Sequence, residues 1–120
     1  MNIEELFDYC VSIKGAEAST PFDEVTIVVK VMDKMFAMIP TDNEVCSITL
    51  KCDPEKAINL RETYDCVEAA FHMNKTYWNT ISMDGSMADS EIIDWINHSV
   101  DEVIKKLPKI RQAEYYGTSK

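Results

Sequence analysis

The sequence predicts an α+β fold in the order α-β-β-β-α-β-β-α, with a mostly antiparallel sheet and helices packed on one face of it. Two observations support this class. Apolar residues recur at helical spacing near both ends of the chain and in its middle, whereas the runs between them are β-branched or alternating. The chain has 120 residues, 46% of them apolar and 28% charged. This size and composition are those of a single globular domain over residues 1–120.

The first element is a helix whose two ends are both encoded. Asn2 is a favourable N-cap, and Glu5, three positions later, can return a hydrogen bond to the backbone of the cap. The apolar stripe of this helix comprises Ile3, Leu6, Phe7 and Cys10. Gly15 can adopt the left-handed turn that ends the helix. A short polar linker over residues 16–21 follows.

Three strand-like runs come next, over residues 25–32, 35–39 and 45–52. The pair Asp33-Lys34 is predicted to form the turn between the first two runs. Alternation divides the third run into two faces. Its core face is predicted to hold Cys46, Ile48, Leu50 and Cys52. Its solvent face is predicted to hold Ser47, Thr49 and Lys51. We therefore expect an antiparallel meander with one wet face.

The next elements are a helix and two short strands. Asp53 followed by Pro54 predicts the start of the helix, because a capping Asp and a Pro at the first helical position both suit a helix N-terminus. Short strands are expected over residues 66–71 and 80–83. Between them lies a polar, aromatic-bearing connection over residues 72–79.

The final helix is expected to begin at a capping box formed by Ser86 and Asp89. Its buried stripe is predicted to consist of Ile93, Ile96, Val100, Val103, Ile104 and Leu107. Pro108 is expected to end the helix, because proline cannot continue it. Residues 109–120 are expected to form a frayed tail.

The chain is acidic, which limits the classes of partner. Twelve Lys and Arg residues against twenty-one Asp and Glu residues give a net charge of −9. A surface of this charge repels polyanions, so gripping nucleic acid with the entire surface is disfavoured, whereas a local basic patch remains compatible with it. The apolar stretches fall short of the roughly 18–20 residues of a spanning helix. The N-terminus is acidic where a secretory signal is basic. We expect a cytoplasmic protein with no membrane partner.

The sequence predicts no catalytic site, no cofactor and no metal site. Three glycines cannot form a phosphate-binding loop, and no serine lies in a G-x-S-x-G motif. Cys52 lies at a predicted helix start, which can lower a thiol pKa, but alternation places it toward the core. Asp94 and His98 could together touch a metal, yet one helix face offers a line of ligands rather than a cage. We expect His98 on the solvated face of its helix, and a protein that is not an enzyme.

Two groups of residues are candidate nucleic-acid contacts. The first group lies in the polar connection and comprises His72, Asn74, Lys75 and Trp78. These residue types contact phosphates or stack on bases. The second group comprises Lys30, Lys34 and Lys51, which would form a basic strip if the first and third strands lie close together.

Each group also has a structural interpretation. Trp78 can pack in the core, while Asn74 and His72 can bond the backbone of a tight loop. Lysines on strands protect sheet edges from aggregation. Lys105 and Lys106 stand near the end of the last helix, where the helix dipole alone favours basic residues.

Several short motifs identify a family resemblance. They are Pro21-Phe22-Asp23, Lys34-Met35-Phe36-Ala37, Leu50-Lys51-Cys52-Asp53-Pro54 and, above all, His72-Met73-Asn74-Lys75-Thr76-Tyr77-Trp78-Asn79-Thr80. Through them nearly the whole chain resembles the MmcQ/YjbR family of small bacterial proteins. Ala70-Phe71 stands where the family commonly has Gly-Tyr, and Tyr77 stands where a second His is frequent.

The resemblance implies a single α+β domain similar to the frataxin-like and secretion-chaperone-like folds. It also implies a DNA-binding role through two winged hairpins. Carried over residue by residue, the contact set implied by the resemblance is Lys30, Lys34, Lys51, His72, Asn74, Lys75 and Trp78.

Three functions follow as hypotheses. The first is a monomeric, non-catalytic DNA-binding accessory or regulatory protein, which uses a local basic patch on an acidic domain. The second is a protein-interaction or chaperone-like module that presents its sheet face to a protein partner, and an exposed apolar patch on that face would favour it. The third is an acidic-surface cation binder by analogy with frataxin, which calorimetry with iron or manganese would test.

Overall fold

The computed structural model describes residues 1–21, 23–70 and 73–117, and it shows an α+β fold. The elements in these ranges are α1 (Ile3–Ser12), β1 (Glu17–Ser19), β2 (Thr26–Val31), β3 (Lys34–Pro40), β4 (Ser47–Lys51), α2 (Pro54–Thr63), β5 (Val67–Ala69), β6 (Trp78–Ser82), α3 (Asp89–Ile104) and α4 (Lys109–Tyr116). The strands form one open sheet in the order β1-β2-β3-β4-β6-β5, and every neighbouring pair is antiparallel. The predicted fold class is confirmed.

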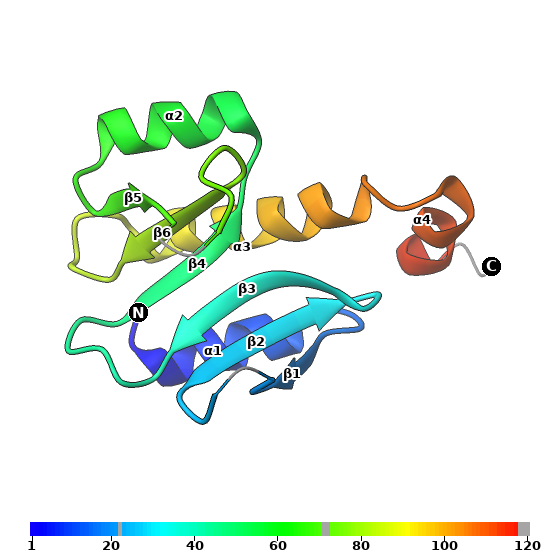
Figure 1. Cartoon of the computed structure of the whole chain (residues 1–120), viewed down its shortest axis with the longest axis horizontal. Helices are drawn as coiled ribbons and strands as arrows, with labels where there is room; N and C mark the ends of the chain where they lie inside the picture. The colour runs from blue at the N-terminus through cyan, green and yellow to red at the C-terminus, as the bar shows by residue number, and fades with distance from the viewer. Residues whose placement is uncertain (22, 71–72, 118–120) are drawn as a thin grey trace.

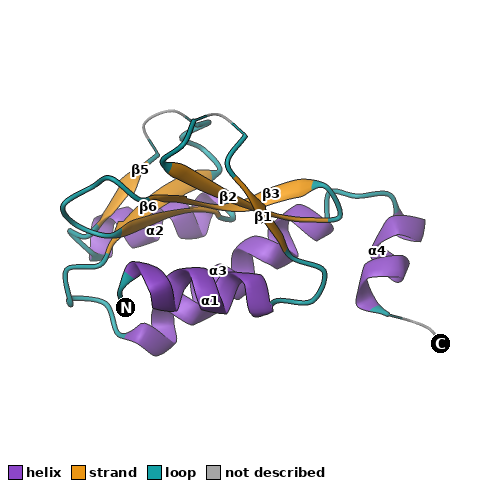
Figure 2. Cartoon of the chain, turned by 90° about the horizontal axis from the view of Figure 1, so that it is seen from below, coloured by secondary structure: helices purple, strands orange, loops and turns teal. Residues whose placement is uncertain are grey.

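Helices α1 and α3 lie side by side against one face of the sheet, and no helix of the described ranges covers the other face (Figure 1, Figure 2). The core fills the space between these two layers. Leu6 of α1, Phe36 of β3 and Ile96 of α3 are completely buried there. Helix α2 lies beside β5 at one end of the sheet, and α4 projects beyond the other end (Figure 1). None of the helices in the described ranges combines the length and the apolar character needed to span a bilayer.

Two predicted helix starts are confirmed in detail. The Asn2 side chain accepts a hydrogen bond from the Glu5 backbone at 2.8 Å, and the Glu5 carboxylate accepts one from the Asn2 backbone at 2.9 Å. The Asp53 carboxylate accepts a hydrogen bond from the Lys56 backbone at 3.2 Å, with Pro54 as the first helical residue. Both caps depend only on residues close in sequence, so the local pattern suffices to predict them.

The first hairpin turns one residue earlier than predicted. Met32 and Asp33 adopt positive φ angles of 50° and 66°, as the central residues of a type I′ turn require. Lys34 is therefore not a turn residue. It begins β3 and pairs with Val31 across the hairpin.

Two segments expected to be irregular are ordered. The linker contributes β1, in which Glu17 pairs with Lys30 of β2, because the outer edge of β2 offers unpaired backbone groups. The expected frayed tail contains α4, which Pro108 starts as its N-cap. Helix α3 ends at Ile104, before Pro108 is reached, so the proline does not end it as predicted but begins a new helix, which its fixed φ angle suits.

The start of α3 also differs from the prediction. Its N-cap is Ala88, which provides no side-chain hydrogen bond, so the expected capping box is absent. Ser86 instead hydrogen-bonds to the carboxylate of Asp84 within the preceding turn. The buried stripe of α3 begins at Ile92 rather than at Ile93, which is only half-buried. The helix is therefore rotated slightly from the orientation expected from the sequence.

One buried hydroxyl joins α3 to the two central strands. β3 and β4 pair at Ala37 with Leu50 and at Met38 with Thr49. At the next position, Ser99 of α3 donates a hydrogen bond to the Phe36 carbonyl at 2.6 Å. The same hydroxyl accepts a hydrogen bond from the Lys51 backbone at 2.9 Å. It therefore satisfies two backbone groups at the place where the strands separate.

Replacing Ser99 by Ala is expected to lower the free energy of unfolding by about 2–3 kcal/mol, because two backbone groups lose their partner in a buried site. Urea denaturation of the wild type and the variant measures the difference. The control is Ser90→Ala, on the exposed side of the same helix, which is expected to leave stability almost unchanged. Equal stability of the Ser99→Ala variant and the wild type would show that the bridge is unimportant.

Candidate nucleic-acid interface

Lysines from three parts of the fold meet where β3 and β4 separate. Lys34 is the first residue of β3, Lys51 is the last residue of β4, and Lys106 follows the end of α3. They line a hollow of about 300 Å³ together with Met35, Trp78 and Val103. We call this site the basic hollow. Figure 1 shows β3 and β4 diverging, with α3 passing behind them.

The aromatic ring of Tyr77 lies beside the basic hollow. The ammonium groups of Lys51 and Lys106 are each 5.9 Å from the centre of this ring. The backbone of Tyr77 is fixed by two hydrogen bonds. Its N–H donates to the Asn74 carbonyl at 3.1 Å, and its carbonyl accepts from the Cys52 N–H at 2.7 Å. The hollow therefore combines positive charge with a fixed aromatic face, the two features used in binding nucleic-acid strands.

The lysines of the basic hollow are close enough to repel one another. Partial burial lowers the pKa of the Lys51 ammonium group, and the positive charge of Lys106 lowers it further. Lys105 and Lys34 act in the same direction, whereas Glu102 opposes them. A bound anion would relieve this repulsion, because it favours the charged form of each lysine.

Glu102 is the acidic neighbour of the basic hollow. Its carboxylate lies 2.7 Å from the Lys105 ammonium group, and it is largely buried. This hydrogen bond raises the pKa of Lys105. Glu102 therefore holds Lys105 at the end of α3 and compensates part of the positive charge there.

The structure brings together three of the predicted contact residues. Lys34, Lys51 and Trp78 all line the basic hollow, and Trp78 is the direct cross-strand neighbour of Lys51. Lys30 lies on β2, which β3 separates from β4, so the first and third predicted strands are not neighbours. Lys30 pairs instead with Glu17 on one side and with Met35 on the other.

The remaining predicted contacts lie in the connection before β6. Asn74 accepts a hydrogen bond from the Thr76 backbone at 2.9 Å, so its side chain shapes the loop. Lys75 donates to the Ala70 carbonyl at 3.4 Å. His72 lies outside the described residues. Trp78 is buried and begins β6, although the sequence analysis placed it in the connection.

A buried amide anchors this connection to α2. The side-chain oxygen of Asn79 accepts a hydrogen bond from Arg61 at 2.6 Å, and its amide group donates to the Ala57 carbonyl at 3.2 Å. Arg61 also donates to the Lys75 carbonyl at 3.2 Å. Asn79 is 2% exposed, so both hydrogen bonds are shielded from water. Within the His72–Thr80 motif, these contacts give the Lys75 carbonyl and the Asn79 side chain a structural role that requires no bound ligand.

Sequence reasoning missed Lys106 and Tyr77 as members of the site. The helix dipole accounts for Lys106 in the sequence, and it gave no reason to look for a second role. Its proximity to Lys51 depends on the direction in which α3 crosses the sheet. Tyr77 lies inside the connection that already contained candidate residues, and Lys106 lies among the basic residues near the end of the last helix, but only the tertiary fold brings the two together.

His98 is not on a solvated row of charges, as the sequence analysis expected. It is half-buried, and its Nε2 atom accepts a hydrogen bond from the Asp53 backbone at 3.1 Å. Its ring packs edge-on against Trp95, with the ring centres 5.2 Å apart. The imidazole therefore joins α3 to the start of α2. In the described part of the chain, no group of three or more His, Cys, Asp or Glu side chains is arranged to hold a metal ion.

The position of Cys52 at a helix start does not activate its thiol. Burial raises the pKa of Cys52 to about 11, and the neighbouring Asp53 carboxylate acts in the same direction. The thiol is 3% exposed, as its alternation predicted. All four cysteines are free thiols. A nucleophilic role for Cys52 therefore has no support from its surroundings.

A family model and a curated relative show the same family. Residues 11–101 match the family model described as YjbR. The chain is 36% identical over 109 residues to the uncharacterized protein YjbR of Escherichia coli strain K12, covering 91% of this chain and 92% of that protein. It is 29% identical over 93 residues to the uncharacterized protein YbdF of Escherichia coli O157:H7, covering 78% of this chain and 76% of that one.

Solved structures show the same fold. The crystal structure of Deinococcus radiodurans protein DR2400, described as a DUF419 domain, superposes with a TM-score of 0.88 at 27% identity. The match covers 95% of this chain and 87% of that one. A crystal structure of a Pseudomonas syringae protein superposes with a TM-score of 0.71 at 26% identity, covering 82% of this chain and 96% of that one.

Acidification is expected to destabilise the fold through His98. Burial lowers the pKa of His98 from its usual 6.5, and a protonated Nε2 cannot accept the Asp53 hydrogen bond. The unfolded chain thus takes up this proton at a higher pH than the folded chain does. The stabilisation by neutral His98 is complete above the pKa that His98 has in the unfolded chain. It is lost as the pH falls from that pKa to the lower pKa of His98 in the folded chain.

Urea denaturation at several values between about pH 7 and pH 5 measures this effect. The reference is His98→Gln, which cannot titrate in this range. The wild type is expected to lose more stability than the variant over this interval. Parallel curves for the two proteins would show that His98 is not the group responsible.

The thiol of Cys52 is expected to resist alkylation in the folded protein at about pH 8, because its raised pKa leaves almost no thiolate. Iodoacetamide labelling followed by peptide mass spectrometry measures the modified fraction at each cysteine. Cys46 is less buried and is expected to react faster. Addition of urea is expected to equalise the two rates. Rapid labelling of Cys52 in the folded state would contradict this account.

Proposed function

The chain belongs to the YjbR family, and we propose that it is a non-catalytic DNA-binding accessory or regulatory protein that contacts phosphates through the basic hollow. One observation carries the proposal. Lys34, Lys51 and Lys106 converge from separate elements around Tyr77 and Trp78, although the chain as a whole has a charge of −9. A local concentration of lysines on an acidic molecule needs a reason other than net charge.

The residue chemistry fits the backbone of a nucleic acid better than its bases. Lysine ammonium groups contact phosphate oxygens as point charges and carry no sequence information by themselves. Lys34 and Lys106 are exposed and can reach outward, while Lys51 lies deeper between them. The proposed contact is therefore electrostatic, weakly sequence-selective and sensitive to salt.

The acidic remainder of the molecule limits the affinity. Phosphates outside the basic hollow meet the surface of a chain that carries an excess of nine negative charges. The favourable contacts are confined to the few phosphates that the hollow reaches. Neutralising about three phosphates predicts a slope near −3 for the logarithm of the binding constant against the logarithm of salt concentration.

Binding of a fluorescent duplex of roughly 20 base pairs, followed by anisotropy at about 20 mM salt and above, tests the proposal. The test variant is Lys34→Glu with Lys106→Glu. It is expected to weaken binding by at least about tenfold and to reduce the salt slope by about 2, because two phosphate contacts are lost.

The matched control is Lys14→Glu with Lys56→Glu, which makes the same change in net charge at exposed positions outside the basic hollow. It is expected to retain most of the affinity. An equal loss in both double variants would mean that only the total charge matters. Absence of binding by the wild type at the lowest salt concentration would rule out the proposed function.

A further inference from the structure

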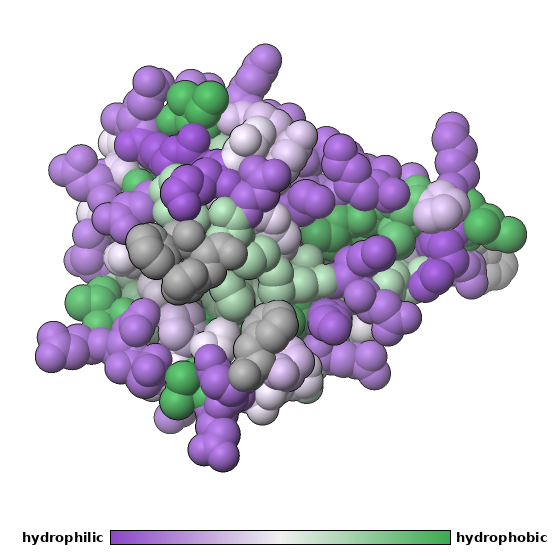
Figure 3. Space-filling view, viewed as in Figure 1, coloured by the Kyte–Doolittle hydropathy of each residue, from purple (hydrophilic) through white to green (hydrophobic). Residues whose placement is uncertain are grey.

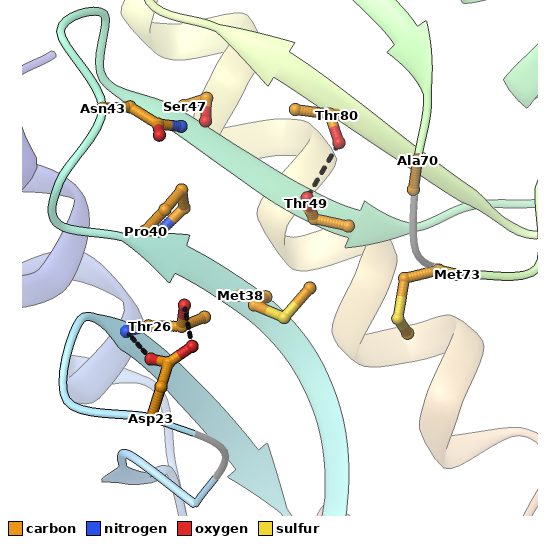
Figure 4. A pocket seen from close by; sticks show the side chains of 10 residues that line it. All are labelled: Asp23, Thr26, Met38, Pro40, Asn43, Ser47, Thr49, Ala70, Met73 and Thr80. Atoms are coloured by element: carbon orange, nitrogen blue, oxygen red, sulfur yellow. Dashed lines mark hydrogen bonds between the residues drawn. The ribbon is translucent and has the colours of Figure 1, made fainter.

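The uncovered face of the sheet contains a second, larger hollow of about 560 Å³ (Figure 4). Its walls include Met38 of β3, Ser47 and Thr49 of β4, and Thr80 of β6, with Met73 closing one side. We call this site the sheet hollow. Its volume lies in the range of about 300–1,000 Å³ that is usual for small-molecule sites. In Figure 3, near-neutral and weakly hydrophobic side chains cover the middle of this face, and hydrophilic side chains surround them.

A serine hydroxyl in this hollow has no partner. Ser47 is 6% exposed, and its hydroxyl makes no hydrogen bond within the described ranges 1–21, 23–70 and 73–117. Figure 4 shows this hydroxyl near the Asn43 amide at the upper rim of the hollow. No buried side-chain oxygen or nitrogen of the described residues lacks a hydrogen-bond partner, so this oxygen is not fully enclosed and is reached from the hollow. It is available to a molecule that enters the hollow.

The neighbouring hydroxyls are only partly used. Thr49 and Thr80 face each other across β4 and β6, and their oxygens are 2.8 Å apart. Each hydroxyl can donate once and accept twice, so one donor and further acceptors remain after this bond. Together with Ser47, they form a short polar row along the floor. Met38 and Met73 provide an adaptable apolar surface beside this row.

The charges around the sheet hollow define its ligand. Asp23 is the single ionisable side chain among the described residues that line it. Its carboxylate already accepts hydrogen bonds from the Val25 and Thr26 backbones at 2.9 and 2.7 Å, and these bonds lower the pKa of Asp23. No lysine, arginine or histidine belongs to the described lining. The described lining therefore supplies no positive charge to neutralise an anion, and the one carboxylate it supplies already shares its charge with two backbone N–H groups.

We propose that the sheet hollow binds an uncharged small molecule with an apolar body and a hydrogen-bonding amide or hydroxyl group. The polar group bonds to Ser47 and its threonine neighbours, and the apolar body packs on Met38 and Met73. This site is separate from the basic hollow, and its lining differs from that of the basic hollow in every residue. The proposal does not depend on DNA binding.

Three probes that share one apolar body test the charge requirement. They are N-acetyl-leucinamide, which is uncharged, N-acetyl-leucine, which is anionic, and leucinamide, which is cationic. The readout is the NMR spectrum of the full chain with ¹³C-labelled methionine methyl groups. Met38 and Met73 report on the sheet hollow, while Met35 reports on the basic hollow. The uncharged probe is expected to shift the Met38 and Met73 signals with a dissociation constant of roughly millimolar order, as its small size allows.

Ser47→Ala is the diagnostic variant, because it removes the hydroxyl and leaves the wall of the hollow in place. It is expected to weaken binding of the uncharged probe by about threefold to tenfold, as loss of one hydrogen bond predicts. The matched control is Ser90→Ala, at an exposed position of α3, and this variant is expected to bind the uncharged probe as the wild type does. The methyl spectra of both variants without probe show whether they are folded.

Three outcomes would overturn the proposal. The first is the absence of saturable shifts at Met38 and Met73 with the uncharged probe. The second is equal binding by all three probes, and the third is equal affinity of the Ser47→Ala variant and the wild type, because in either case the hollow would lack the proposed chemistry. If Ser47→Ala is unfolded, Asn43→Ala at the exposed rim replaces it, and unchanged affinity of that variant counts against the proposal.

Discussion

The hydroxyl of Ser99 determines how the central strands and α3 meet. β3 and β4 could continue their ladder past Ala37 and Leu50, but the hydroxyl bonds to both backbones there instead. Because the Phe36 carbonyl and the Lys51 N–H are satisfied by a helix, the strands can separate without leaving buried polar groups unpaired. The basic hollow occupies this place, and α3 continues past it toward Lys106. The two hydrogen bonds of Ser99 therefore stabilise the strand separation at which the lysines of the basic hollow meet.

The net charge of the chain does not describe how charge is distributed over its surface. The value of −9 is compatible with a region in which burial, and then repulsion from Lys106 and Lys34, lowers the pKa of Lys51. Such repulsion costs stability in the free protein. Glu102 offsets part of it, because its negative charge contacts Lys105 and opposes the lowering of the Lys51 pKa. The distribution of charge, rather than its sum, is therefore the quantity that bears on a polyanionic partner.

Local signals allowed most of the fold to be predicted from the sequence. The capping box at Asn2 and the Asp53 cap each involve residues within one helical turn, so their physics is visible in the sequence. Strand β1 and the place of Lys106 depend on partners far along the chain. His98 shows the same limit. Its helix position indicated a solvated face, but the start of α2 covers it. Lys34, Lys51 and Trp78, which are half of the residues lining the basic hollow, were therefore predicted from the sequence. That they meet Lys106 was not predictable, because this depends on the tertiary fold.

The alternation of β4 connects the two hollows. Ser47 and Thr49 line the sheet hollow, and Lys51, the next residue of the same parity, lines the basic hollow. Residues two apart on a strand are about 6.6–6.8 Å apart, so Thr49 of the sheet hollow and Lys51 of the basic hollow lie close together along β4. Their linings nevertheless differ in charge, because the strand passes from hydroxyls to an ammonium group where β3 separates from it. One strand therefore supplies hydroxyl groups to one hollow and an ammonium group to the other without any change in its backbone pairing with β6.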